Sequence, residues 1–234
     1  MTDIFQIASV GMQDAGQRME AISQNAASAS LPGYRRHVVA GRPFTAELAA
    51  SGADPLPQQV DVRPGSLLST GRPLDVAVQT DDLFFELTDG ERTWLTRAGA
   101  FRVNQDGVLV GEQGLRVVGA EGDVRIPPGD VTVEADGRIT QQGVTVATLQ
   151  LFRPTERASL VPVQGSLLST NADIDPAEAG MGRVRGGALE AANTDAATEM
   201  IDLMSTARQF ESLTRVAQGY DTVLGHAIEK LAEV

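Results

Sequence analysis

The side chains that most often carry chemistry are sparse in this chain of 234 residues. Cysteine is absent, which excludes disulfides, thiolate metal sites and a thiol nucleophile. His37 and His226 are the only histidines, and neither has a second imidazole at metal-ligand spacing, so each is predicted to be solvent-exposed or at an interface. The acidic runs at 81–82 and 173–175 do not continue into the spaced oxygen ligands of a calcium loop and favour solvated turns.

Motifs for nucleophilic or phosphate chemistry are also missing from the sequence. No serine stands in a Gly-x-Ser-x-Gly elbow. Gly107 and Gly111 are not followed by Gly-Lys-Ser or Gly-Lys-Thr, so they fit turns better than a phosphate-binding loop. The sequence therefore predicts no catalytic residues, no cofactor and no metal ligands, and the chain is not expected to be an enzyme.

Charge and hydropathy exclude two further classes of partner. The 19 basic and 31 acidic residues give a formal charge of -12, whereas binding to a phosphate backbone needs a basic face, so nucleic acid is not expected. No apolar run approaches the roughly 20 residues that cross a bilayer, so direct membrane insertion is not expected either. The first residues lack a basic segment followed by an apolar one, which argues against a cleaved signal peptide.

Both ends of the chain have the spacing of amphipathic helices, and we expect them to pack together or against other subunits. Near the C-terminus, steps of three and four form a seam that needs a partner helix, made by Met200, Leu203, Ala207, Phe210, Ala217, Leu224, Ile228 and Leu231. Near the N-terminus, a narrow stripe of mostly small residues would let another helix approach closely, and it contains Ile4, Ala8, Gly11, Ala15, Met19, Ile22, Ala26 and Ala29.

The first turns of the C-terminal helix are acidic. The spacing of Asp195, Glu199 and Asp202 predicts an exposed helix face, and these charges suit the positive end of the helix dipole. Asn193 or Thr194 is predicted to cap the helix.

Between the two ends, the pattern is that of β-strands. Alternating or apolar runs cover 74–78, 83–87 and 144–152. Asp-Gly pairs at 89–90, 106–107 and 136–137 supply the positive φ that hairpin turns need. No helical stretch interrupts these runs, which disfavours a parallel sheet. The predicted fold class is α+β, with N- and C-terminal helices forming a helical or coiled-coil domain around a central antiparallel all-β domain.

Proline and glycine mark the expected boundaries. Leu31-Pro32-Gly33 should end the first helix, and Tyr34 follows as an exposed or docking aromatic. The hexapeptide Gly-Ser-Leu-Leu-Ser-Thr occurs at 65–70 and again at 165–170, either as equivalent entry and exit segments of the β domain or by chance. The predicted division is terminal helices over 1–33 and 188–234, extended connectors over 34–73 and 166–187, and the β domain over 74–165.

After its first helix the chain has Asn25, Ala27 and Gly33, followed by the aromatic and basic pair Tyr34-Arg35. These residues resemble a signature of the flagellar basal-body rod and hook proteins, in which the first helix is followed by an Asn-Asn-Leu-Ala-Asn segment and then by Gly-Phe and a basic residue. Departures at Gln24, Ala26 and Ser28 weaken this one motif. The other segments that resemble family signatures are Ser69–Ala77, Thr96–Phe101, Gly187–Asn193 and Glu199–Glu211.

The resemblance implies a structural, non-enzymatic subunit of the rod, most like the proximal-rod branch of the family, with the distal-rod branch as the alternative. It implies export by the flagellar type III apparatus without a cleaved signal peptide, and a place in the periplasmic rod of the basal body. The implied partners are other copies of the chain and other rod proteins. A different reading is a β-rich binding module with a helical oligomerisation stalk, but the aromatic residues are scattered rather than clustered.

Helical stripes and family motifs together predict which residues form the assembly interface. They are Ile4, Gly11, Ala15, Met19, Ile22, Asn25, Gly33, Tyr34, Asn193, Met200, Leu203, Ala207, Phe210, Ala217, Leu224, Ile228 and Leu231.

Overall fold

The computed structural model describes residues 4–40, 58–156, 159–178 and 183–232, without the side chains of 4, 5 and 224–232. Contacts divide the chain into two units. Unit 1 comprises 1–26, 37–58 and 196–234, and unit 2 comprises 27–36 and 59–195. Each unit is therefore assembled from segments that are far apart in the sequence.

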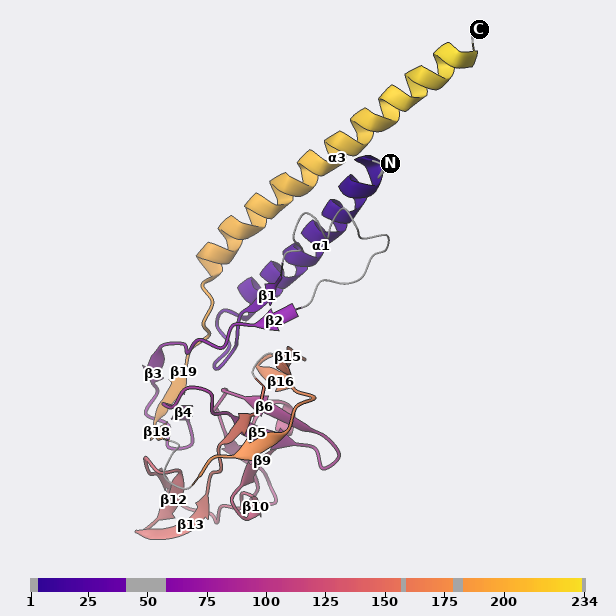
Figure 1. The fold of residues 1–234 in the computed structure, drawn as a ribbon. Helices are drawn as coiled ribbons and strands as arrows, with labels where there is room; N and C mark the ends of the chain where they lie inside the picture. The colour runs from indigo at the N-terminus through magenta and orange to yellow at the C-terminus, as the bar shows by residue number, and fades with distance from the viewer. Residues whose placement is uncertain (1–3, 41–57, 157–158, 179–182, 233–234) are drawn as a thin grey trace. The chain divides into compact units, whose positions relative to one another are not determined.

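Unit 1 contains the two long helices of the chain. Helix α1 spans Ile4–Ser28 and helix α3 spans Ala196–Ala232 (Figure 1), and the short strand β1 (His37–Val39) belongs to the same unit. The Leu31 N–H donates to the Ser28 carbonyl at 2.9 Å, which closes α1 just before the predicted stop at Leu31-Pro32-Gly33. Two terminal helices and an antiparallel β region between them confirm the α+β class.

The main sheet of unit 2 is antiparallel, in the order β15-β16-β6-β5-β9-β8-β7, with β10 paired to β9. Between β8 and β9 the chain makes one 3-10 turn, Glu112–Gly114. The strands are β5 (Phe85–Thr88), β6 (Thr93–Thr96), β7 (Arg102–Val103), β8 (Leu109–Val110), β9 (Arg116–Gly119), β10 (Gly122–Asp123), β15 (Val161–Pro162) and β16 (Leu167–Ser169).

Smaller antiparallel sheets complete unit 2. One is β11 (Thr132–Val133), β12 (Arg138–Gln141) and β13 (Val144–Thr148); the pairs are β14 (Phe152–Pro154) with β17 (Ile174–Pro176), β4 (Val76–Val78) with β18 (Val184–Gly186), and β3 (Leu67–Ser69) with β19 (Ala188–Glu190). Strand β2 covers Gln58–Val60. Strands β3, β16, β17 and β18 come from segments that the sequence assigned to extended connectors.

The three Asp-Gly pairs form the predicted hairpin turns. Gly90 joins β5 to β6, Gly107 joins β7 to β8, and Gly137 joins β11 to β12, with φ of 104°, 74° and 87°. These values lie in the region that glycine adopts without the penalty of a Cβ atom.

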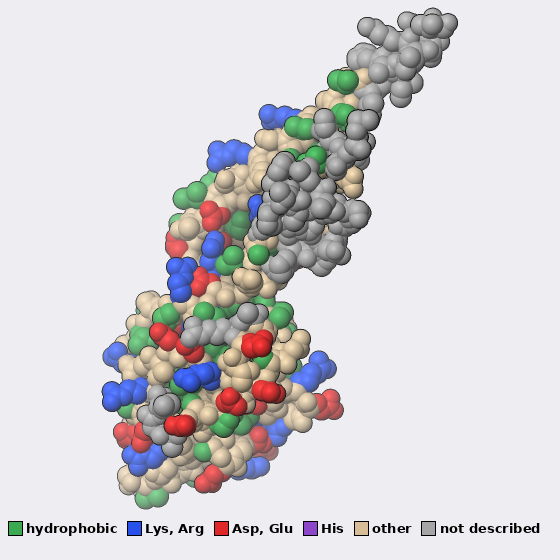
Figure 2. All heavy atoms as spheres, viewed as in Figure 1, with side chains coloured by type: hydrophobic (Ala, Val, Ile, Leu, Met, Phe, Trp, Pro, Cys, Tyr) green, Lys and Arg blue, Asp and Glu red, His purple; other side chains and the backbone are tan. Residues whose placement is uncertain are grey.

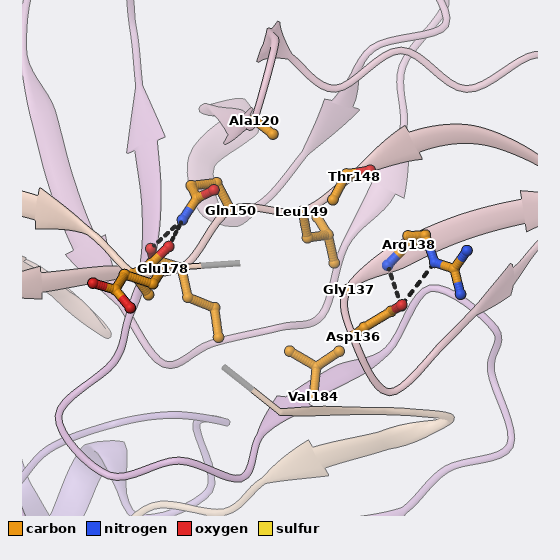
Figure 3. Close-up of a pocket in the computed structure, with 11 residues that line it drawn as sticks. Ala120, Asp136, Gly137, Arg138, Thr148, Leu149, Gln150, Glu178 and Val184 are labelled. Atoms are coloured by element: carbon orange, nitrogen blue, oxygen red, sulfur yellow. Dashed lines mark hydrogen bonds and ion pairs between the residues drawn. The ribbon is translucent and has the colours of Figure 1, made fainter. Parts of the chain in front are cut away.

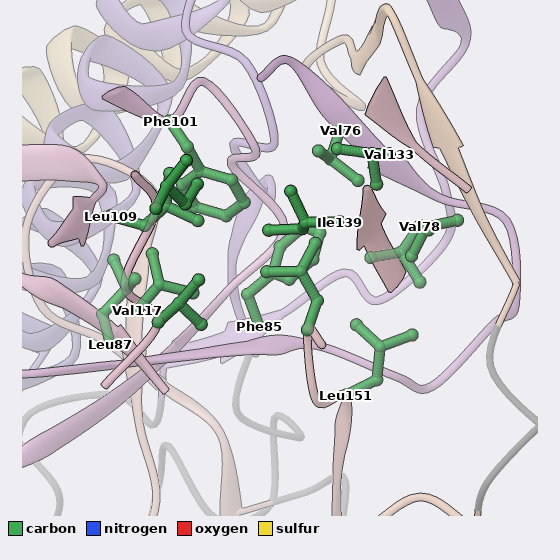
Figure 4. Packing of buried hydrophobic residues seen from close by; sticks show 14 of the residues in the cluster. Val76, Val78, Phe85, Leu87, Phe101, Leu109, Val117, Val133, Ile139 and Leu151 are labelled. Carbon is green, nitrogen blue, oxygen red and sulfur yellow. The ribbon is translucent and has the colours of Figure 1, made fainter. Parts of the chain in front are cut away.

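The core of unit 2 is apolar and forms two clusters. In the larger cluster (Figure 4), the rings of Phe85 and Phe101 meet edge to face, with centroids 4.9 Å apart. The smaller cluster contains Phe84, Leu95, Leu160 and Leu168. Strand β16 contributes Leu167 to the first cluster and Leu168 to the second, so it joins the two.

Candidate assembly surfaces

Helices α1 and α3 run antiparallel, with small residues where they meet. A Cβ atom on Gly11 would lie 3.0 Å from Leu213 Cδ1. The Thr214 hydroxyl lies 3.5 Å from Met12 Sδ. At the other end of α1, Asn25 Nδ2 lies 3.5 Å from Glu199 Oε2. The small-residue stripe of the N-terminal helix therefore permits the close approach that its composition predicted.

Most of the predicted seam residues with described side chains lie at least partly buried in unit 1. Met200 differs, because 58% of it is exposed and it lies away from the α1 contact. The side chains of Ile4, Leu224, Ile228 and Leu231 lie outside the described residues. Ala15, Asn25 and Ala217 are buried, and Gly11, Met19, Ile22, Leu203, Ala207 and Phe210 are partly buried.

Two polar residues enter this helical contact: Asn25, which the sequence analysis placed at the interface, and Glu199, which it did not. Glu199 is 1% exposed, so the prediction that it lies on an exposed face is wrong. Asn25 is fully buried: its Oδ1 accepts from the His37 N–H at 2.8 Å and its Nδ2 donates to the His37 carbonyl at 2.9 Å. Burial lowers the pKa of His37. Through these two hydrogen bonds, Asn25 links strand β1 to helix α1 in the way that the backbone of a paired strand would.

On its side away from α1, helix α3 exposes apolar residues among polar and charged ones, and these exposed apolar residues are called its outer apolar face. Methionine is well suited to such a face, because its flexible thioether adapts to the surface of a partner. The exposed apolar residues and their exposed fractions are Met200 58%, Ile201 62%, Met204 55%, Val216 50% and Val223 66%.

Helix α3 also continues past the described start of α1. Since Gly11 faces Leu213 in an antiparallel pair, Ile4 at the start of α1 comes level with Tyr220. Helix α3 runs on to Ala232, which Figure 1 shows as the turns beyond the N-terminus of α1. This overhang of about a dozen residues is roughly 18 Å long. The predicted seam positions 224, 228 and 231 fall within it.

A buried charge cluster in unit 2 joins the segment after α1 to the segment before α3. Glu190 Oε1 accepts from Arg35 Nη2 at 2.5 Å, and Glu190 Oε2 accepts from Arg97 Nε at 2.8 Å, with all three side chains at most 2% exposed. Arg97 also donates to the carbonyls of Thr80, Leu83 and Val78. Burial lowers the pKa of Arg97, against the opposing effect of the Glu190 charge. No sequence period signals these residues, because buried charges break the apolar pattern.

Gly33, Tyr34 and Asn193 belong to the same junction. The Gly33 N–H donates to the Glu190 carbonyl at 2.7 Å, and a Cβ at Gly33 would lie 2.2 Å from the Ala98 nitrogen. Tyr34 was predicted to be an exposed or a docking aromatic; it is 1% exposed, so the first of these alternatives is wrong. The Asn193 amide donates to the carbonyls of Asp61 and Arg63 and accepts from the Arg36 N–H, which excludes it as the helix cap. Their part in assembly remains a prediction.

In the described part of unit 2, the hollows do not bring together side chains that could act in catalysis. The hollow in Figure 3 has a volume near 320 Å³ and contains the Asp136–Arg138 ion pair at 2.7 Å. Its Gln150 amide donates to the carbonyls of Leu151 and Ala177. Acidic and basic side chains are interspersed on the face of unit 2 in Figure 2. Within the described ranges, no group of histidine, cysteine and acidic residues could hold a metal ion, and no helix is apolar enough to span a membrane.

Comparison with known proteins gives matches over most of the chain. Residues 80–141 match the model of the flagellar hook protein FlgE/F/G D1 domain, and residues 185–229 match that of the flagellar basal body rod FlgEFG protein C-terminal region. The first match lies within unit 2 and the second extends from β18 along α3. The two models thus cover the β region and the C-terminal helix separately.

Whole-length relatives agree with these matches. The flagellar basal-body rod protein FlgF of Escherichia coli is 32% identical over 233 residues, which cover 90% of each chain. FlgF of Salmonella typhimurium is 31% identical over 235 residues, with 90% of each covered. FlgG of Agrobacterium fabrum is 30% identical over 245 residues, which cover 90% of this chain and 92% of the relative. Because these relatives are 30–32% identical to the chain and cover 90% of it, the chain belongs to the flagellar basal-body rod protein family, whose members are structural proteins and not enzymes.

Proposed function

We propose that this chain is a subunit of the proximal rod that assembles with other copies and other rod proteins through its terminal helices. The observation that carries this proposal is helix α3, which uses one face on α1 and leaves its outer apolar face exposed. Contacts between non-equivalent faces of identical subunits do not close on themselves and generate helical filaments. A coiled-coil arrangement of the seams fits the overhang of α3.

The proposal extends to export and location. Export of an unfolded chain by the flagellar type III apparatus, without a cleaved signal peptide, suits a protein that has no cysteine. The site of action is then the periplasmic rod of the basal body. The similarity to FlgF proteins favours a role in the proximal rod. The similarity to FlgG of Agrobacterium fabrum makes a role in the distal rod the second candidate for this chain.

A matched pair of α3 variants tests the assembly role. Met204→Asp places a charge on the outer apolar face, whereas Met204→Leu keeps the same position apolar. Met204→Asp is expected to lower incorporation into isolated basal bodies at least about tenfold, the equivalent of about 1.4 kcal/mol of contact free energy. Met204→Leu should incorporate normally, and the circular dichroism of both purified variants should match that of the parent chain.

Normal incorporation of Met204→Asp would contradict the proposal. Deletion of the gene in its own host separates the two rod candidates. If the chain is a proximal-rod subunit, the deletion strain loses motility. Expression of this chain should restore motility, and additional copies of the host's FlgG relative should not.

A further inference from the structure

Strand β3 presents exposed apolar side chains on unit 2. Leu67 is 38% exposed and Leu68 is 55% exposed. Their neighbours on the paired strand β19 are buried, with Leu68 opposite Leu189 and Leu67 opposite Glu190. As consecutive strand residues, the two leucines lie on opposite faces of this two-stranded sheet, and both are exposed although the paired strand is buried.

The outer edge of β3 is open in the described part of unit 2. The Ala191 N–H donates to the Ser66 carbonyl and the Thr70 N–H donates to the Gly187 carbonyl. Because antiparallel ladders alternate, the peptide groups of Leu67 and Ser69 point to the opposite side. That side is the edge away from β19, where the described residues supply no pairing strand.

Two edge strands of the main sheet, β15 and β7, contain residues that disfavour pairing with another strand. Pro162 in edge strand β15 has no N–H to donate outward, and Arg102 places a charge in edge strand β7. Strand β3 has neither proline nor charge. An apolar edge strand without proline or charge is a site where another chain can add a strand.

The strand is held rigidly from its buried side. Glu190 Oε1 accepts from the Gly65 N–H at 2.9 Å while its carboxylate is fixed by Arg35 and Arg97. A Cβ at Gly65 would lie 2.0 Å from the Ala191 carbonyl oxygen, so the backbone of β3 is packed closely on the next segment. A preordered strand loses little conformational entropy when a partner binds.

The charges beside β3 identify the kind of partner. Arg63 before the strand and Arg72 after it have 80% and 67% of their side chains exposed, whereas the carboxylates paired with them, Asp61 and Asp75, are 12% and 1% exposed. The edge therefore presents guanidinium groups at both ends in a chain whose net charge is -12. A complementary partner has an acidic surface beside an extended apolar segment, and a second copy of this acidic, strand-rich chain provides both.

We propose that the open edge of β3, centred on Leu67 and Leu68, is a lateral docking site for a second copy of this chain. The proposal rests on the proposed rod function, and it adds a contact made by unit 2 to the contacts made by the helices. The contact is heterologous, so a row of subunits can repeat it without closing.

Single-cysteine labelling in assembled rods tests the site, since the chain has no cysteine of its own. Leu68→Cys and Val163→Cys are matched variants, at positions that are 55% and 54% exposed. Both thiols should react with a fluorescent maleimide in the purified chain. In isolated basal bodies the thiol at position 68 should react about tenfold more slowly, because a covered thiol is shielded, and the thiol at 163 should react as before.

A benzophenone maleimide attached at position 68 then identifies the neighbour. A cross-linked peptide from a second copy supports the proposal, whereas a peptide from another basal-body protein or from none overturns it. Equal reactivity at 68 and 163 in rods also overturns it, as does normal rod assembly by Leu68→Arg. If Met204→Asp blocks assembly while Leu68→Arg does not, only the docking site fails; if neither variant affects assembly, the proposed rod contacts fail as well.

Discussion

The hexapeptide at 65–70 and its copy at 165–170 have one sequence and opposite environments. In the first copy Leu67 and Leu68 are 38% and 55% exposed on β3, whereas in the second Leu167 and Leu168 are each 2% exposed on β16. The first pairs with β19 at an open edge, and the second lies between β15 and β6 in the main sheet. The prediction that they are equivalent entry and exit segments is therefore wrong.

Each copy is held at its start by a glutamate, but the two glutamates differ. Glu190 accepts from the Gly65 N–H and is neutralised by two buried arginines. Glu112 accepts from the Ser166 N–H at 3.2 Å, and burial raises its pKa. The same local sequence is thus supported by a buried ion cluster in one place and by a single half-buried carboxyl in the other.

The largest difference between the copies should come from their glutamates. Glu190→Leu leaves Arg35 and Arg97 buried without a carboxylate, and the free energy of unfolding should fall by about 3–5 kcal/mol. Urea denaturation of the purified chain measures this loss. Glu112→Leu serves as the control and should cost far less, since no buried charge loses its partner. Equal losses would show that the arginines do not depend on Glu190.

A smaller difference is expected from the leucines themselves. Leu167→Ala opens a cavity in the larger core cluster and should lower the free energy of unfolding by about 2–5 kcal/mol. Leu67→Ala changes an exposed position and should stay within about 0.5 kcal/mol of the parent chain. Urea denaturation of both variants measures the contrast, which disappears if the two copies are in fact equally buried.

The smallest effect should be a dependence on pH at the second copy. The raised pKa of Glu112 means that the folded state binds a proton more readily than the unfolded state. This contribution to stability is present below the ordinary glutamate pKa and is lost as the pH rises through the folded pKa. Glu112→Gln should therefore gain stability relative to the parent chain as the pH rises through this range. Parallel curves of unfolding free energy against pH would contradict the assignment.

Local sequence chemistry predicted much of the fold correctly. Asp-Gly pairs placed three hairpins, because few residues other than glycine adopt positive φ at low cost. Helical spacing placed both terminal helices, and their small residues at Gly11 and Ala15 indicated a close helix contact. The phase of the C-terminal seam was less accurate: Met200 lies outside the contact with α1, and the buried residue beside it is Glu199.

The contacts that the sequence did not predict join residues that are distant in sequence. Glu190 and Asn193 meet Arg35 and Arg36 across more than a hundred residues, as do Asn25 and Glu199. A charged or amide side chain read alone indicates solvent, because burial is tolerated only when a partner compensates it. No local pattern contains that partner.

The sequence by itself determined the two terminal helices and the three Asp-Gly hairpins, since each depends on residue type and local spacing. The tertiary structure alone decided which copy of Gly-Ser-Leu-Leu-Ser-Thr is buried and which polar side chains lie inside. Burial is a property of the surrounding chain, and identical residues take the environment that their distant neighbours create.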